Sequence, residues 1–346
     1  MLAHTAAAAA PGAVRRATVP PMHTTDQNAT FPAIAVVGAG AVGSYFGALL
    51  ARTGCRVTLI GRAPHVHAVQ RLGLQLHRDG RVETVALAAS TDMAAVRGAS
   101  LVLVCVKSGD TDAVARELAP LLAPQALVLS LQNGVQNVAT LARHLRRTVV
   151  PGVVYAATAL PAPGVVQHFG GGDLVIGPGV APAAADPTPD VAQREPLQAL
   201  AALFTSAGVA VRVSPDAMAE LWAKLVVNCA CNAVSALAQA NYGQMAGLLA
   251  VRELQQAAVR EAVAVGRADG QALSLDALLA AVDHIAATMP SQRSSTAQDL
   301  ARGRRSEIDH LNGHVARRGA ELGIATPVNQ ALWALVKLAE AAHAAP

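Results

Sequence analysis

The sequence contains few aromatic and few charged residues. Of its 346 residues, 3% are aromatic and 14% are charged, whereas 53% are hydrophobic. A chain with so much aliphatic surface is not disordered over most of its length, because it can bury a large core. The net charge is only +4, and no Lys/Arg cluster is interleaved with aromatic residues, as a nucleic-acid surface would require. We therefore expect a globular protein that binds no nucleic acid.

Cysteine is scarce as well. Cys55, Cys105, Cys229 and Cys231 form no CxxC pair, and no histidine lies near them at metal-ligand spacing. The sequence therefore predicts neither a metal site nor a disulfide framework. We expect reduced, mostly buried thiols in a cytoplasmic protein.

Charge is absent from Phe31 to Ala51, a stretch long enough to cross a membrane. Its glycines, and a change from a strand-like to a helix-like pattern, argue against a span, so we expect no membrane association. The preceding residues, 1–31, combine an alanine run with several prolines and histidines, and we expect a disordered leader. A signal peptide is disfavoured because Arg15 and Arg16 follow the alanine run. Met22 is our candidate for the true start.

After the leader, short β-branched segments alternate with Ala/Leu-rich segments, which is typical of βαβ units. The later strand candidates are close together, so we expect an antiparallel extension of the sheet. Residues 178–196, rich in Pro, Ala and Asp, are expected to form an exposed loop. The strand candidates are residues 34–37, 56–60, 101–106, 127–129, 148–153, 164–169, 174–176 and 209–213.

From about Ser214 onward nearly everything has a helical pattern, with breaks near residues 241–243, 269–270, 289–290 and 326–327. The predicted fold class is thus an α/β Rossmann-type dinucleotide-binding domain, residues 32–214, followed by an all-α domain, residues 215–346. At 346 residues, two domains agree with a usual domain size of ~100–150 residues. A small ligand would bind in the cleft between them.

The first motif is Gly38-Ala39-Gly40-Ala41-Val42-Gly43, which follows an apolar strand and opens a helix near Val42. In a GxGxxG turn the first glycine permits the tight turn and the second lets the backbone approach a pyrophosphate. The third lets helix and strand pack closely. Because this turn lies at the start of a βαβ unit, we predict dinucleotide binding rather than a purely structural turn.

The second strand candidate runs into Gly61 and Arg62, where an NAD-binding domain usually has an acidic residue for the ribose hydroxyls. An arginine pairs instead with a 2′-phosphate, so NADPH is favoured over NADH. The alternative is an ordinary surface arginine.

Polar residues also follow two further strand candidates. Lys107 comes after Val104-Cys105-Val106, and Asn133 comes after Leu129-Ser130-Leu131-Gln132. Both would lie at the ligand edge of a doubly wound sheet, Lys107 near a ribose or anion and Asn133 near the nicotinamide. Each residue alone could equally be a turn residue.

In the helical half, Lys224, Asn228 and Asn232 are spaced four apart among apolar residues, so they share one helix face. They form either a polar seam between helices or part of a ligand site, because buried polar groups need partners. A second polar segment, residues 294–313, contains Ser295 and Glu307. On its own it could be a solvated loop.

Together these segments resemble the ketopantoate reductase (2-dehydropantoate 2-reductase) family, over about residues 34–337. The most specific resemblance is in two phrases. One is Trp222-Ala-Lys224-Leu-x-x-Asn228-Cys-x-x-Asn232. The other is Ser295-x-x-Gln298-Asp299, followed by Gly303-Arg304-x-x-Glu307-Ile-Asp309-x-x-Asn312-Gly313.

The resemblance implies NADPH-dependent reduction of ketopantoate to pantoate, in the biosynthesis of pantothenate and coenzyme A. It implies that Lys224 is the proton donor and that Glu307 holds Lys224 or the product hydroxyl. It further implies that Asn228, Asn232 and Ser295 bind the substrate, and that Asn133 and Lys107 lie beside the nicotinamide and the cofactor ribose.

Three alternatives stay open: a reductase of another small 2-keto acid, a non-catalytic NADPH sensor, and a β-hydroxyacid or opine-type dehydrogenase. A sensor would have no need of a proton donor such as Lys224. A dehydrogenase of the last group would not be expected to contain the Glu307-Ile-Asp309 phrase. The oligomeric state is also open, a homodimer being one option.

Overall fold

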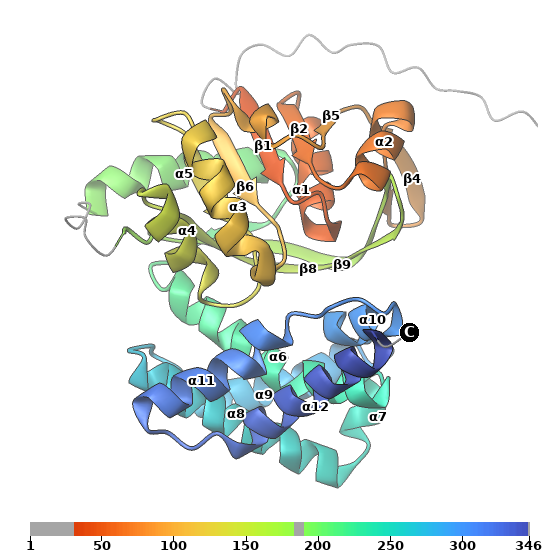
Figure 1. Ribbon diagram of the computed structural model, residues 1–346, viewed down its shortest axis with the longest axis vertical. Coiled ribbons are helices and arrows are strands. Elements are labelled where there is room, and N and C mark those ends of the chain that lie inside the picture. The colour runs from red at the N-terminus through yellow and green to blue at the C-terminus, as the bar shows by residue number, and fades with distance from the viewer. Residues whose placement is uncertain (1–30, 183–189, 345–346) are drawn as a thin grey trace, which may run out of the picture.

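The computed structural model describes residues 31–182 and 190–344. The predicted leader lies outside these residues except for Phe31, which is 6% exposed and belongs to the core because its ring is large and apolar. Figure 1 shows two lobes: a sheet lobe, residues 31–213, and a helical lobe, residues 217–344. The fold class predicted from the sequence is confirmed.

The sheet lobe alternates strands and helices along its first half and ends in two long strands. The strands are β1 (Ala33–Val37), β2 (Arg56–Ile60), β3 (Leu74–Arg78), β4 (Arg81–Val85), β5 (Ala88–Ser90), β6 (Leu101–Val104), β7 (Leu127–Ser130), β8 (Val150–Ala162), β9 (Val165–Ile176) and β10 (Val211–Val213). The helices are α1 (Ala41–Ala51), α2 (Ala63–Leu72), α3 (Thr111–Leu118), α4 (Asn137–Leu145) and α5 (Asp190–Ser206), with short 3-10 turns η1 (Met93–Val96), η2 (Ser108–Asp110) and η3 (Ala119–Leu121).

One half of the sheet has the doubly wound Rossmann topology. Its strand order is β5-β2-β1-β6-β7-β8, and every neighbouring pair in it is parallel. This is the 3-2-1-4-5-6 order of dinucleotide-binding domains, in which the ligand crevice lies at the carboxyl ends of the strands, where the order reverses beside β1. In the structure that place is the β1–α1 turn.

The other half of the sheet differs in part from the expectation. The strand candidates 164–169 and 174–176 form one strand, β9, which begins at Val165 and pairs with β8 in antiparallel fashion, as predicted. β10, however, pairs with β9 in parallel, because α5 connects the two strands and returns the chain to the same end. α5 also replaces the end of the loop predicted over residues 178–196: it begins at Asp190, in a segment rich in Ala, Leu and Gln, which favour helix.

Three strands were missed: β3, β4 and β5. β3 and β4 form an antiparallel hairpin beside β9, and β5 is a three-residue edge strand beside β2. All but one of the residues of β4 are exposed, so the strand has no apolar periodicity to detect.

Helices cover both faces of the sheet. α1 and α5 share one face, where the Phe46 and Phe204 rings meet edge to face at 5.7 Å, whereas α3 and α4 pack together on the other face. The core beneath α3 and α4 continues without a break into the helical lobe. The two lobes are therefore joined by packed side chains as well as by the chain.

The helical lobe is built around α6 (Ala217–Ala238), which also packs on β8. The predicted helix breaks near residues 241, 269, 289 and 326 all occur. α6 is long and apolar enough to cross a membrane by length and composition alone, but 61% of that window is buried inside the protein, as in the core helix of a folded domain. The other elements are α7 (Tyr242–Ala246), α8 (Leu249–Ala268), α9 (Leu275–Thr288), α10 (Ser295–Ala301), η4 (Ile308–His310), α11 (Asn312–Leu322) and α12 (Pro327–Ala344).

Candidate active site

The glycine turn has a shape that only glycine permits at two of its positions. Gly38 has φ +100°, and a Cβ there would lie 2.5 Å from the Val106 nitrogen. A Cβ on Gly43 would lie 2.3 Å from the Gly38 carbonyl oxygen, which shows how closely α1 packs against β1. The first and third glycines are thus required by the fold itself.

Gly40 is different, because a Cβ there would meet no atom within 4 Å. It is the N-cap residue of α1, and no side chain caps the helix. The amides of Ala41, Val42 and Gly43 belong to the first helical turn, where N–H groups have no intrahelical acceptor. Open space in front of uncapped amides fits a bound phosphate, which the helix dipole also favours. The turn therefore fits the pyrophosphate of a dinucleotide.

Arg62 lies beside this turn. It is the N-cap residue of α2, directly after β2, and the preceding Gly61 packs against Ala39, whose Cβ would be 2.7 Å from a Cβ on Gly61. The guanidinium is exposed and makes no ion pair or hydrogen bond with another described residue. A cation in this place is free to bind an anionic group on the adenosine side of a dinucleotide.

Lys107 reaches from the sheet lobe to the helical lobe. Its Nζ donates to Asp299 Oδ2 and to the Arg305 carbonyl oxygen, each at 2.8 Å. Burial raises the pKa of the Asp299 carboxyl, while Lys107 opposes the rise. Lys107 therefore holds the loop that carries Glu307 close to the ends of the strands.

Glu307 is also bound by the sheet lobe. Its Oε1 accepts from the Ser108 amide and the Ser108 hydroxyl, each at 2.8 Å, and its Oε2 is 3.4 Å from Asn133 Nδ2. Ser108 begins η2, which leads into α3, so the carboxylate lies at a helix start, where negative charge is stabilised. The two strand-end residues predicted for the cofactor site, Lys107 and Asn133, are thus both joined to the loop of Glu307.

Lys224 lies on α6 where that helix crosses β8. Its Nζ donates to the Val154 carbonyl oxygen at 2.5 Å and lies 5.9 Å from the centre of the Tyr155 ring. Burial lowers the pKa of Lys224 to about 8, although the nearby Glu307 carboxylate opposes the shift. No hydrogen bond or ion pair among the described residues joins Lys224 to Glu307. An ammonium with this pKa can give up a proton near neutral pH far more readily than an exposed lysine.

Asn228 and Asn232 lie one and two turns further along the same face of α6. Asn228 is half-buried and Asn232 is 4% exposed, yet neither side-chain amide makes a hydrogen bond with another described residue. Neither amide is among the fully buried side-chain groups that lack a partner, so both reach solvent. Two accessible amides in line with an ammonium fit a polar ligand.

Ser295 is the first residue of α10 and is exposed. Its neighbour Ser294 fixes α10 to α6, because the Ser294 hydroxyl caps α10 at Ala297 and is 3.2 Å from the Asn232 carbonyl oxygen. Ser295 is therefore held in a fixed place beside Asn232. Its hydroxyl makes no hydrogen bond within the described part of the chain.

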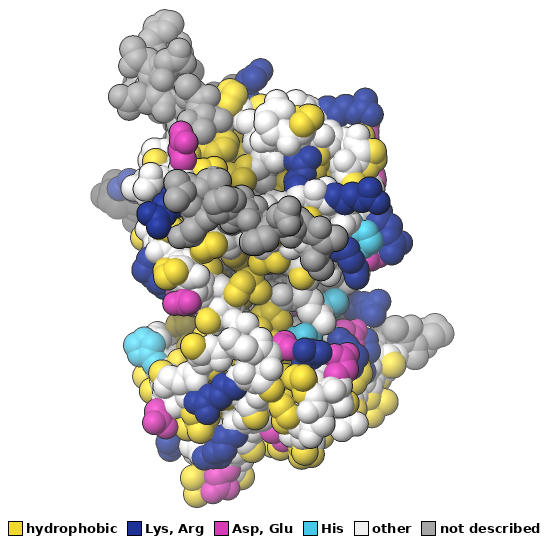
Figure 2. Space-filling model, turned by 90° about the vertical axis from the view of Figure 1, so that its left-hand side faces the viewer, with side chains coloured by type: hydrophobic (Ala, Val, Ile, Leu, Met, Phe, Trp, Pro, Cys, Tyr) yellow, Lys and Arg dark blue, Asp and Glu magenta, His cyan; other side chains and the backbone are white. Residues whose placement is uncertain are grey.

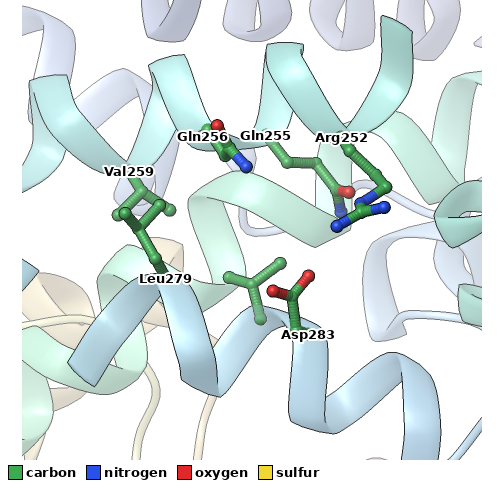
Figure 3. Close-up of a pocket in the computed structure, with 7 residues that line it drawn as sticks. Arg252, Gln255, Gln256, Val259, Leu279 and Asp283 are labelled. Carbon is green, nitrogen blue, oxygen red and sulfur yellow. The ribbon is translucent and has the colours of Figure 1, made fainter. Parts of the chain in front are cut away.

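The crevice between α8 and α9 is too small for a keto acid. Figure 3 shows the crevice between α8 and α9, lined by Arg252 and Asp283 among others; its volume of about 10 Å³ admits a single water molecule. The junction of the two lobes, by contrast, gathers hydrophobic side chains on the face seen in Figure 2. Among the described residues no group of His, Cys, Asp and Glu is arranged to hold a metal ion.

Sequence reasoning missed three residues of this site: Ser108, Asp299 and Tyr155. Ser108 and Asp299 stood next to predicted residues or within the quoted phrases, but only the folded chain shows that they bind Glu307 and Lys107. Tyr155 lies two residues beyond the predicted end of its strand, which runs on to Ala162. A polar residue directly after a strand-end lysine was the one local signal available for Ser108.

Comparison with known proteins gives a consistent result. The profile of the family described as ketopantoate reductase PanE/ApbA matches residues 34–180, and the profile of its C-terminal domain matches residues 216–340. The chain is 35% identical, over 310 residues, to a 2-dehydropantoate 2-reductase of Halobacterium salinarum, which covers 89% of this chain and 98% of the relative.

Two solved structures extend the comparison. A PanE/ApbA family ketopantoate reductase from Ralstonia eutropha JMP134 is 48% identical, with a TM-score of 0.82, covering 90% of this chain and 99% of that one. A ternary structure of D-mandelate dehydrogenase with NADH and anilino(oxo)acetate is 24% identical, with a TM-score of 0.83, covering 90% of this chain and all of the other. The second likeness is one of fold alone.

Proposed function

The chain belongs to the ketopantoate reductase PanE/ApbA family, and on that premise we propose that it reduces 2-dehydropantoate to pantoate with NADPH. As a member of this family it is an oxidoreductase. The observation that carries the proposal is Lys224, an ammonium with a pKa of about 8 on the same helix face as two unpaired amides. Such a set of groups suits the reduction of a keto acid, which needs one proton and several donors.

The family supports a nicotinamide dinucleotide as the cofactor, and Arg62 favours NADPH. When bound, the dinucleotide supplies the hydride for the keto carbon. The uncapped start of α1 holds its pyrophosphate, and the free guanidinium of Arg62 pairs with the 2′-phosphate. Lys107 and Asn133, at the ends of the next two strands, bind its ribose and nicotinamide side.

Lys224 acts as the proton donor. Negative charge builds on the substrate oxygen as the keto group is reduced, and a nearby ammonium stabilises that charge before it donates a proton. Its lowered pKa makes the transfer easy near neutral pH. The Glu307 carboxylate lies close enough to oppose the lowering of the Lys224 pKa, and it accepts a hydrogen bond from Lys224 or from the product hydroxyl.

Asn228, Asn232 and Ser295 bind the substrate. The two amides on α6 lack protein partners and can donate to the carboxylate or hydroxyl of a small acid. Ser295, fixed beside Asn232 through its neighbour Ser294, adds a third donor at the start of α10, where an anion is favoured.

A second candidate keeps the reaction and changes the substrate to an aryl 2-keto acid. It is favoured by Tyr155, which is 43% exposed beside Lys224 and offers an aromatic wall to the substrate. A non-catalytic sensor is disfavoured, since it would not need Lys224 and Glu307. Cytoplasmic location and a homodimer stay predictions.

The decisive experiment is an assay of NADPH oxidation with 2-dehydropantoate, 2-oxoisovalerate, benzoylformate and pyruvate as competing substrates. We expect the highest kcat/KM for 2-dehydropantoate. Preference for benzoylformate would select the second candidate, and absence of turnover with every keto acid would overturn both. Repeating the assay with Tyr155→Ala tests the aromatic wall directly, since this variant should lower kcat/KM more for an aryl acid than for 2-dehydropantoate.

A further inference from the structure

A chain of buried hydrogen bonds runs through the sheet lobe and ends on Glu307. Ser130 donates to Gln132, Gln132 to Thr111, Thr111 to Asn137 and Asn137 to Ser108, over distances of 2.7–3.1 Å. Ser108 donates to Glu307 Oε1 at 2.8 Å. We call these residues the Ser130–Ser108 chain. All five are nearly inaccessible: Ser130 2%, Gln132 5%, Thr111 2%, Asn137 3% and Ser108 4% exposed.

The direction of the chain is fixed by main-chain carbonyl groups. Gln132 Nε2 also donates to the Val106 oxygen at 3.0 Å, so the other end of this amide, Oε1, faces Ser130. Asn137 Nδ2 also donates to the Asn133 oxygen at 2.6 Å, so its Oδ1 faces Thr111. Because an amide nitrogen cannot accept these bonds, each member accepts from the one before it and donates to the next.

The last link distinguishes the two oxygens of Glu307. Oε1 receives both the amide and the hydroxyl of Ser108, whereas Oε2 has only a 3.4 Å contact with Asn133. The Ser108 hydroxyl has a single proton, and the charged Glu307 carboxylate at 2.8 Å attracts it more strongly than the neutral main-chain oxygen of Asn133 at 2.9 Å. The proton of Ser108 is thereby directed to Glu307, and Oε2 is the oxygen left to act.

We propose that the Ser130–Ser108 chain is a positioning device, built into the sheet lobe, that holds the Glu307 carboxylate of the helical lobe with Oε2 toward the reacting groups. This inference rests on the proposed function, since the Ser130–Ser108 chain acts only through Glu307. It serves no binding role of its own, because its members are buried behind the strand ends. Fully paired polar networks of this kind are rigid, and a rigid support for a catalytic carboxylate lowers the cost of reaching the reactive geometry.

Thr111 is the residue to change, because it lies in the middle of the chain and does not touch Glu307. Thr111→Val keeps the shape of the side chain but removes the hydroxyl, leaving Asn137 Oδ1 without its donor. We expect kcat for the keto acid to fall about tenfold, with KM and the NADPH dissociation constant unchanged. Thr111→Ser restores the hydroxyl and should restore kcat. Thr326→Val is the matched control, since Thr326 is also buried but lies outside the chain.

A double-mutant cycle separates positioning from a general structural effect. If the Ser130–Ser108 chain acts through Glu307, Thr111→Val should lower kcat about tenfold in the wild-type background and should lower it no further in a Glu307→Gln background. An equal loss in both backgrounds, or no loss in the wild type, would overturn the positioning role. If Glu307→Gln itself retains the wild-type kcat, the proposed role of Glu307 fails, and the inference that rests on it fails with it.

Discussion

The two halves of the site are built in different ways. The pyrophosphate turn of the cofactor half is made of main chain: glycines and first-turn amides that lie within six consecutive residues of the sheet lobe. The catalytic half is made of side chains with distant partners, since Lys224 bonds a residue 70 positions away and Glu307 one 199 positions away. The first half needs only local folding, whereas the second exists only when the two lobes are packed together.

This difference makes the two halves separable by mutation. Changes to the catalytic side chains should abolish turnover and spare cofactor binding, whereas changes to the turn should weaken cofactor binding and spare turnover at saturation. Three substitutions and one pH series test this separation, beginning with the substitution of largest expected effect.

Lys224→Ala removes the proton donor. We expect kcat to fall by about 10²–10⁴-fold, the range of general acid catalysis, because no other ammonium lies in its place. NADPH binding, measured by fluorescence titration, should be unchanged, since the turn is in the other lobe. Turnover near the wild-type rate would refute the proposed role of Lys224.

The pH dependence should report the same group. The pKa of Lys224 is lowered to about 8, and reduction needs the protonated form, so the rate should be level below pH 8 and fall toward tenfold per pH unit above it. Oxidation of the 2-hydroxy acid needs the neutral amine and should rise with pH up to the same value. Initial rates in both directions between pH 6 and 10 measure this. A reduction rate that stays level to pH 10 would show that another group donates the proton.

The same contrast explains what the sequence could predict. The glycine turn and the helix face of Lys224, Asn228 and Asn232 follow from spacing along one element, and the structure contains both. The Ser130–Ser108 chain could not be predicted, because Ser, Thr and Asn are ordinary turn residues until the fold brings them together. The parallel pairing of β10 was missed for a similar reason, since it depends on where α5 returns the chain rather than on the strand's own residues.

Gly40→Ala tests the cofactor half. A Cβ at this position meets no protein atom within 4 Å, and φ is −82°, so the fold should be kept and Tm unchanged. The added methyl occupies the space proposed for the pyrophosphate, so the NADPH dissociation constant should rise by about 10–100-fold, the loss of one or two charge-assisted hydrogen bonds. kcat at saturating NADPH should stay near that of the wild type.

Two glycines serve as controls for this change. Gly247→Ala, at an exposed position with φ −70°, should affect neither stability nor binding. Gly43→Ala should instead lower Tm, because its Cβ would lie 2.3 Å from the Gly38 oxygen. Unchanged NADPH binding in Gly40→Ala would show that the cofactor does not approach this turn.

Arg62→Ala has the smallest expected effect, because an exposed ion pair is partly screened by water and salt. We expect KM for NADPH to rise about tenfold and KM for NADH to stay unchanged, since only the 2′-phosphate is lost as a partner. Arg71→Ala, at the other end of α2, is the matched control and should change neither constant. An equal rise for both cofactors would mean that Arg62 acts on a part that the two dinucleotides share. If only the KM for NADPH rises, Arg62 chooses between the two dinucleotides through the 2′-phosphate. The backbone turn beside it then supplies the affinity that both dinucleotides share.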